Sequence, residues 1–207
     1  ASPHFLFLVE PALPAAQARA LKPFELASRL SYFLWSSMPD DELFQLAEKG
    51  DLSKPAVLRQ QVDRMLKDAR SEAFVQNFTG QWLGLRKVGS NPPAKTLYPE
   101  YDRHLEVSIV GETESFFAEI LRNDLDARSL IRSDFVTINE RLARFYGIPG
   151  VRGDQFRRVP APPESHRGGL VTQASIHSIT SNGTRTSPVT RGVWVLRTLL
   201  GTDPGLP

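Results

Sequence analysis

The 207-residue sequence contains no cysteine. This absence excludes disulfide bonds, thiolate nucleophiles and cysteine-ligated zinc within the chain, and it excludes covalent attachment of a c-type haem. No apolar run is long enough to span a bilayer, since a membrane-spanning helix needs about 20 predominantly apolar residues. We therefore expect no disulfide framework, no covalently attached c-type haem and no membrane span, and we predict no cofactor in this chain.

Lysine is missing from the C-terminal part of the chain. Residues 128–207 hold 11 arginines and 5 acidic residues, a formal charge of +6, whereas residues 1–127 hold 14 basic and 18 acidic residues, a charge of −4. Arginine suits bidentate pairing with carboxylates, sulfates and phosphates. A nucleic-acid surface more often mixes in lysine and aromatic residues, and no nucleic-acid motif is present. The pattern predicts an anionic ligand, or docking onto an acidic part of the same protein, and no nucleic-acid partner.

Histidine is also scarce. The four histidines, His4, His104, His166 and His177, show no metal-binding helical spacing, and none follows a recognisable nucleophile pattern. We therefore predict no metal site. Non-covalent haem bound by histidine and methionine, for electron transfer, is a further alternative that the sequence leaves open.

What the sequence does contain is a series of helix signals. Capping residues, prolines in first turns and apolar residues at spacings of three and four predict a mainly α-helical protein with bundle-like packing. The extended stretches 135–138 and 156–159 predict at most a small two-stranded β element. A proline-rich stretch within 151–167 is the best internal boundary. We expect residues 1–22 to be the end of an upstream domain plus a linker, 23–150 a helical domain, and 151–207 a smaller helical domain that is truncated at its C-terminal linker.

The stretch 168–201 is the most informative part of the sequence. Ser187 and Pro188 predict a helix start, and four apolar residues at helical spacing (Val189, Val193, Leu196 and Leu200) predict one apolar face. The turn signal Asn182-Gly183 precedes this helix, within a hydroxyl-rich loop that also carries arginine. Because a helix N-terminus favours anions, the loop is a candidate ligand-binding site. Its candidate residues are Ser181, Asn182, Thr184, Arg185, Thr186, Ser187 and Arg191. The alternative is that the hydroxyls only cap the helix and the arginines pair with carboxylates elsewhere in the fold.

Two acidic residues on one predicted helix, about 99–122, form a second candidate. Glu112 and Glu119 are seven residues apart and lie near one helix face, with Phe116 between them. Paired inward carboxylates suit metal binding or acid–base chemistry. No Glu-x-x-His pattern accompanies them, as a di-iron site would require. The alternatives are a solvated acidic face or a partner for the arginine-rich half.

Several long stretches resemble a known protein family. The runs FELASRLSYFLWSSMPDDEL (24–43), FVQNFTGQWLGLR (74–86), ETESFFAEILR (112–122) and FVTINERLARFYGIPG (135–150) resemble the domain of unknown function 1592 of planctomycete multidomain proteins associated with cytochrome c. The run 166–202 resembles the cytochrome-like domain of unknown function 1588 that follows it in those proteins. The resemblance implies an exported protein, periplasmic or at the cell surface. It also implies partners in a larger cytochrome-containing assembly and a polysaccharide context, and it supplies no catalytic residues.

Two functions of different classes follow. The first is a structural or ligand-presenting helical module of a larger exported, cytochrome-associated protein. The second is part of a redox or carbohydrate-active enzyme, in which Arg185 and Arg191 hold an anionic substrate in the 181–191 loop and Glu112 or Glu119 acts as base. Whether the chain is an enzyme stays open at this point.

Overall fold

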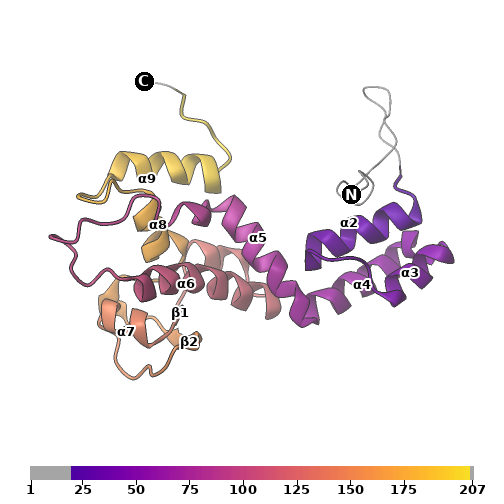
Figure 1. The fold of residues 1–207 in the computed structure, drawn as a ribbon, viewed down its shortest axis with the longest axis horizontal. Coiled ribbons are helices and arrows are strands. Elements are labelled where there is room, and N and C mark those ends of the chain that lie inside the picture. The colour runs from indigo at the N-terminus through magenta and orange to yellow at the C-terminus, as the bar shows by residue number, and fades with distance from the viewer. Residues whose placement is uncertain (1–19, 206–207) are drawn as a thin grey trace. The chain divides into compact units, whose positions relative to one another are not determined.

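A computed structural model describes residues 20–205 of the chain, so residues 1–19 of the expected upstream end and linker lie outside the described residues. Within 20–205 there are eight α-helices and one antiparallel sheet of two strands, as Figure 1 shows. This confirms the predicted fold class, mainly α with a small two-stranded element. None of the helices in the described part is both long enough and apolar enough to cross a bilayer.

The chain forms two compact units, one ending at Phe74 and the other beginning at Val75. The boundary lies within helix α5 (Glu72–Trp82). The domain boundary that the sequence predicts, after residue 150, is a different boundary, and it stays a prediction.

The first unit is built from helices α2 (Pro23–Trp35), α3 (Asp41–Glu48) and α4 (Pro55–Lys67). Their inner faces meet in an apolar core that includes Leu34, Leu43 and Met65. The N-terminal signals act locally as expected, because proline occupies the first turns of α2 and α4 and an aspartate caps α3.

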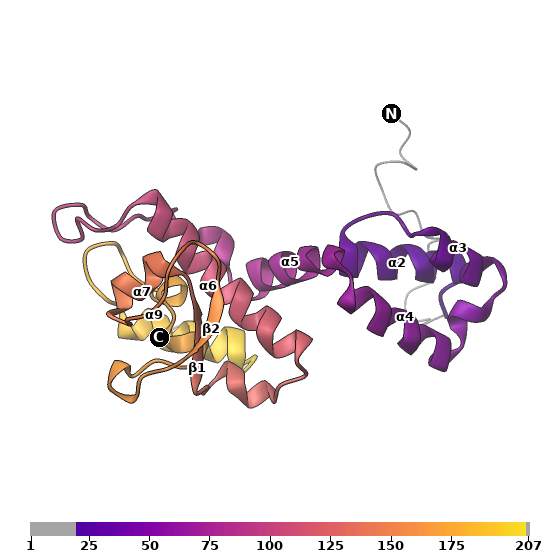
Figure 2. The ribbon, with the colours of Figure 1, turned by 90° about the horizontal axis from the view of Figure 1, so that it is seen from below.

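The second unit is organised around helix α6 (Arg103–Arg122), which contacts β1 (Phe135–Ile138), α7 (Glu140–Tyr146) and α8 (Ala174–Ile179). Figure 2 shows α6 beside α7 and the β1–β2 ribbon. The helix starts later than the predicted 99, because the side chain of Asp102 accepts the N–H of Leu105 and so caps it. A continuous buried face of α6 supports the candidate site described below.

The small sheet and the helix between its two strands follow their sequence signals closely. Strand β1 pairs antiparallel with β2 (Arg157–Pro160), in a register that places Phe135 opposite Pro160. Asn139 then caps α7 by accepting the N–H of Leu142 at 3.0 Å, and Gly147 ends this helix at a positive φ of 71°. The two strands therefore fix both ends of the segment that carries α7, and with it the position of Tyr146 against α6.

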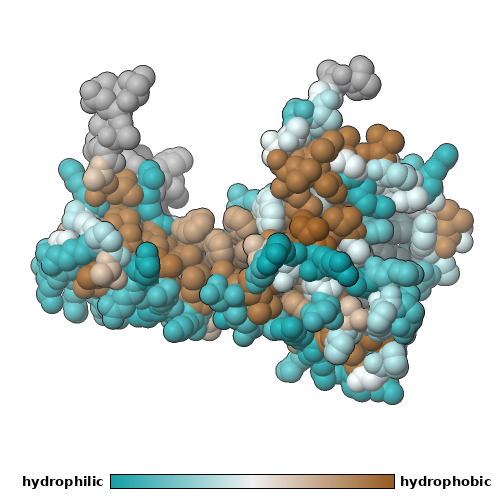
Figure 3. Space-filling model, turned by 180° about the vertical axis from the view of Figure 1, so that it is seen from behind, coloured by the Kyte–Doolittle hydropathy of each residue, from teal (hydrophilic) through white to brown (hydrophobic). Residues whose placement is uncertain are grey.

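The last helix, α9 (Pro188–Trp194), continues as a wider π-helical turn over Val195–Leu199. Only part of the expected apolar face is covered, because Val193 and Leu196 are half-buried whereas Val189 is 78% and Leu200 64% exposed. Apolar side chains accordingly show on the surface over this helix in Figure 3. Trp194 and Leu199 pack against the core. For Leu199, the π-turn shifts the residue away from the 3.6-residue repeat.

Candidate functional site

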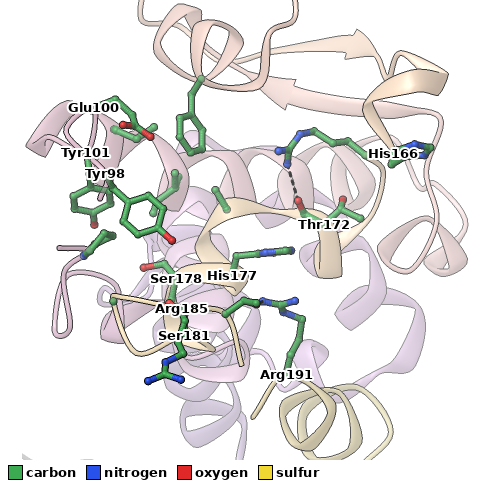
Figure 4. Close-up of a pocket in the computed structure, with 18 of the residues that line it drawn as sticks. Tyr98, Glu100, Tyr101, His166, Thr172, His177, Ser178, Ser181, Arg185 and Arg191 are labelled. Atoms are coloured by element: carbon green, nitrogen blue, oxygen red, sulfur yellow. Dashed lines mark hydrogen bonds between the residues drawn. The ribbon is translucent and has the colours of Figure 1, made fainter. Parts of the chain in front are cut away.

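The predicted loop borders a cavity of about 480 Å³ that lies within the second unit. Its walls come from the segment 93–101, the first half of α6, the end of α7, the segment 165–174, α8 and the loop 181–191. Figure 4 shows Tyr98 and Tyr101 on one side of the cavity and His177 with Arg191 on another. The volume falls within the range of roughly 300–1,000 Å³ that is common for sites of organic ligands.

The loop keeps its shape through its own polar groups. The side-chain oxygen of Asn182 accepts the backbone N–H groups of Thr184 and Arg185, at 3.2 and 2.9 Å. Gly183 adopts a positive φ of 80°, and its carbonyl oxygen accepts the N–H of Ala94 at 2.9 Å. A side chain at position 183 would meet the carbonyl oxygen of Pro92 at 2.8 Å, so the close approach of the two loops requires glycine.

The predicted site residues separate into two groups. Four of them line the cavity, and these are Ser181, Arg185, Thr186 and Arg191. The other three do not line it, and these are Asn182, Thr184 and Ser187. Asn182 and Thr184 complete the turn, while Ser187 caps α9 by accepting the N–H of Thr190 at 3.4 Å. Within the described residues, these three therefore shape the loop.

Arg191 is held in place by two hydroxyl groups. Its Nε donates to the buried Thr180 at 3.3 Å, and one of its terminal nitrogens donates to Thr186 at 3.0 Å. Both partners are neutral, so the positive charge of Arg191 is oriented without being neutralised. Arg185 is exposed at the same cavity.

A third arginine reaches the cavity from a segment that the sequence reasoning did not select. Arg167 donates to the carbonyl oxygen of Thr172 at 2.8 Å, and its guanidinium lies 3.4 Å from the centre of the Tyr146 ring. Stacking on an aromatic face is a favoured position for guanidinium. The signal in the sequence was the glycine pair after Arg167, because paired glycines favour a close backbone approach. The structure has such an approach, since a side chain at position 168 would lie 2.1 Å from the carbonyl oxygen of Ser133.

The apolar lining of the cavity was also missed. Its aromatic wall contains Tyr98, Tyr101 and Phe145, and its apolar residues include Leu105 and Ile109 of α6. Tyr98 and Phe145 are 39% and 40% exposed, so both rings keep a large surface in contact with solvent. No local pattern marks these five residues as a group, since they come from three separate segments.

Glu112 lies one helical turn beyond Ile109 on the same buried face of α6, but it does not line the cavity. Its carboxylate accepts the hydroxyl of Tyr146 at 2.6 Å, and that hydroxyl in turn accepts the N–H of Ala174 at 3.1 Å. Burial raises the pKa of Glu112 to about 7, against the opposing effects of the Tyr146 hydrogen bond and the charge of Arg167. Glu112 is only 1% exposed, so the expected solvated acidic face is wrong for this residue.

Glu119 has a different environment from Glu112. Its carboxylate pairs at 3.2 Å with Arg158, a residue of the arginine-rich C-terminal part, and it does not line the cavity. The two carboxylates therefore do not form one inward pair, and neither faces the cavity where a ligand would lie.

His177 of α8 lines the same cavity as the three arginines. Its Nε2 lies 3.1 Å from the carbonyl oxygen of Val171. Partial burial lowers the pKa of His177, and the nearby charges of Arg191 and Arg167 lower it further. The electrostatic potential at this imidazole is therefore positive, and an anion bound in the cavity would lower that potential.

Two protein-family models match most of the chain. A family model named PSD4, described as a protein of unknown function (DUF1592), matches residues 21–148. A second model named PSCyt3, described as a protein of unknown function (DUF1588), matches residues 167–207. No curated protein and no solved structure matches the chain. The order of the two families agrees with the resemblance noted in the sequence.

Proposed function

Since the chain belongs to the PSD4 family of proteins of unknown function, we propose that it is a helical, ligand-presenting module of a larger cytochrome-associated protein, and that its cavity binds an anionic group. The proposal has two parts. One concerns the ligand, and it rests on the charges in the cavity. The other concerns the larger protein, and it rests on the names of the two matching families.

One observation carries the ligand part. Arg167, Arg185 and Arg191 all line one cavity, and across residues 20–205 none of the three is in an ion pair. Other arginines of the second unit do pair, for example Arg158 with Glu119 and Arg197 with Asp203. One carboxylate, that of Glu100, also lines the cavity, and the charge of Arg167 is partly opposed by the buried Glu112. Three guanidinium groups against one lining carboxylate still leave the cavity net positive, which favours a bound anion.

The two carboxylates that the sequence offered as a base are not placed to act on a ligand in the cavity. A general base must come within hydrogen-bond reach of the proton that it removes. Glu112 is closed off from the cavity and held by Tyr146, and Glu119 is held by Arg158 outside it. We therefore propose no catalytic role for either carboxylate.

The part of the proposal that concerns the larger protein is inferred from the names of the two matching families. PSCyt3 is a cytochrome-like name, and its match covers the segment that supplies Arg167, Arg185 and Arg191. On this basis we propose that the module works in an exported protein, periplasmic or at the cell surface, beside cytochrome-containing domains or chains. The proposal includes no nucleic-acid partner.

Thermal unfolding of the purified chain tests the ligand part. Sulfate, phosphate and acetate would each be titrated at constant ionic strength against chloride, and the melting temperature recorded. Specific binding stabilises the folded state by about 3 kcal/mol when the ligand is at 100 times its dissociation constant. We expect at least one anion to raise the melting temperature in a saturable way.

Matched variants separate site binding from general salt effects. R185A and R191A remove cavity charges, whereas R132A removes an exposed arginine that does not line the cavity. The stabilisation should fall in R191A, and to a smaller extent in R185A, and should persist in R132A. Equal stabilisation in the wild type and in all three variants would contradict the proposal.

A further inference from the structure

The lining of the cavity holds more than positive charge. Leu105 and Ile109 of α6 belong to the lining but are only 1% and 2% exposed, so they form a buried apolar floor. The apolar surface that a ligand could cover comes mainly from Tyr98 and Phe145, which are 39% and 40% exposed. An apolar group of a ligand would displace water from these rings, whereas an inorganic anion would not.

Aromatic rings form the side of the cavity that Tyr98 and Tyr101 occupy in Figure 4. Phe145, at the end of α7, adds a third ring to the lining. Tyr98 and Phe145 each leave more than a third of their surface uncovered. Aromatic faces bind flat rings with a preference of about 0.5–1.5 kcal/mol beyond area burial, so uncovered rings in a cavity favour a ligand that carries a ring.

Arg191 and Arg167 lie apart from this wall, whereas Arg185 lies on the side of Tyr98 in Figure 4. Arg191 extends from α9 to the side of the cavity where His177 lies, as Figure 4 shows, and it is oriented by Thr180 and Thr186. The guanidinium of Arg167 lies over the ring of Tyr146, and its hydrogen bond to the carbonyl oxygen of Thr172 holds it beside the segment 165–174. The cavity is therefore amphipathic, with an apolar and aromatic part and a separate cationic part.

From this division we infer that the cavity selects an organic monoanion in which a carboxylate is joined to a flat apolar ring. Phenylacetate is a simple example of this class of ligand. This inference rests on the proposed anion-binding function. The carboxylate pairs with Arg191, and the ring lies against Tyr98 and Phe145 above the apolar residues of α6. Sugar acids share the charge but present a hydroxylated body, so they gain less from the rings.

The test compares small probes that separate the charge from the ring. Phenylacetate has both, acetate has the charge alone, 2-phenylethanol has the ring alone, and glucuronate has the charge on a polar ring. Each would be titrated into the full 207-residue chain, with binding followed by the amide signals of Ala174 and His177 in nuclear magnetic resonance spectra. We expect saturable shifts with phenylacetate, and binding about tenfold weaker or more for each of the other three probes.

Variants locate the two contacts. Y98A should weaken phenylacetate binding and leave acetate binding unchanged, whereas R191A should weaken both. Y32A removes a tyrosine of the first unit that is 50% exposed, and it should change neither affinity, as should R132A. Both Tyr98 and Tyr32 are partly exposed, so the two alanine variants carry similar risks for folding.

Different outcomes overturn different claims. If acetate or glucuronate binds as tightly as phenylacetate and depends on Arg191, the ligand class is wrong and the anion site stands. If 2-phenylethanol binds as tightly as phenylacetate, the charge contributes nothing, and the inference is overturned. If no anion perturbs Ala174 or His177 in the wild type, the proposed function itself fails.

Discussion

The buried carboxyl of Glu112 makes the stability of the second unit depend on pH in a defined way. Its pKa is raised from an ordinary value of 4.5 to about 7 by burial. Between these two values, the folded state keeps a proton that the unfolded state has already released. Stability therefore falls as the pH rises from about 4.5 to about 7, and the loss is complete above that range. The difference in pKa of about 2.5 corresponds to about 3 kcal/mol.

The variant E112Q isolates this effect, because glutamine has nearly the same shape and does not titrate. The loss of the carboxyl changes the hydrogen bond from Tyr146, but that change is independent of pH. We expect the free energy of unfolding of E112Q, relative to the wild type, to rise by about 3 kcal/mol between about pH 4.5 and about pH 8. This is a large part of the 5–15 kcal/mol that is typical of a domain.

Urea unfolding at several pH values measures this pH-dependent difference in the free energy of unfolding. Trp35 lies in the first unit, whereas Trp82 and Trp194 lie in the second. A W35F background therefore makes tryptophan fluorescence report the second unit. The variant E119Q, which alters a carboxylate paired with Arg158, serves as the control. A difference between E112Q and the wild type that stays constant with pH would refute the reasoning.

Three other predictions follow from the same geometry. A side chain at position 169 would lie 2.2 Å from the carbonyl oxygen of Ile131, so G169A should cost more than about 3 kcal/mol in urea unfolding. G153A has open space at the same sign of φ and should cost only about 1 kcal/mol, and equal losses would contradict this account. Binding of an anion beside Arg191 should raise the lowered pKa of His177, as followed by nuclear magnetic resonance, and an unchanged pKa at saturation would place the anion elsewhere. Added haem should give no saturable Soret band with the purified chain, and a stoichiometric band would revive the electron-transfer alternative.

Local chemistry made much of the fold predictable from the sequence. The cap at Asn139, the stop at Gly147 and the strand Phe135–Ile138 each depend on residues within a few positions of one another. Short-range signals of this kind do not require knowledge of the tertiary packing. The same holds for Ser187 and Pro188 at the start of α9.

The cavity was predictable only in part. The loop residues that line it, among them Arg185 and Arg191, are close together in sequence and carry visible chemistry. Arg167, Tyr98 and Phe145 join them only because α6 brings three distant segments together. Which face of a helix is buried is likewise a tertiary property, and for this reason Val189 is exposed although it fits the helical repeat.

The burial of Glu112 shows the same limit at one residue. The sequence places two carboxylates near one face of a long helix, but it does not show that Tyr146 and Ala174 close over the first of them. Nor does it show that Arg158 pairs with Glu119. Pairing and burial both depend on elements that are far away in the chain.

The most direct test of the account is a crystal of the chain soaked with 4-bromophenylacetate, in which anomalous scattering locates the bromine. The account predicts a bromine peak inside the cavity, beside Tyr98 and Phe145, with the carboxylate within hydrogen-bond distance of Arg191. A bromine peak outside the cavity, or a cavity that holds only water at saturating ligand, would contradict it.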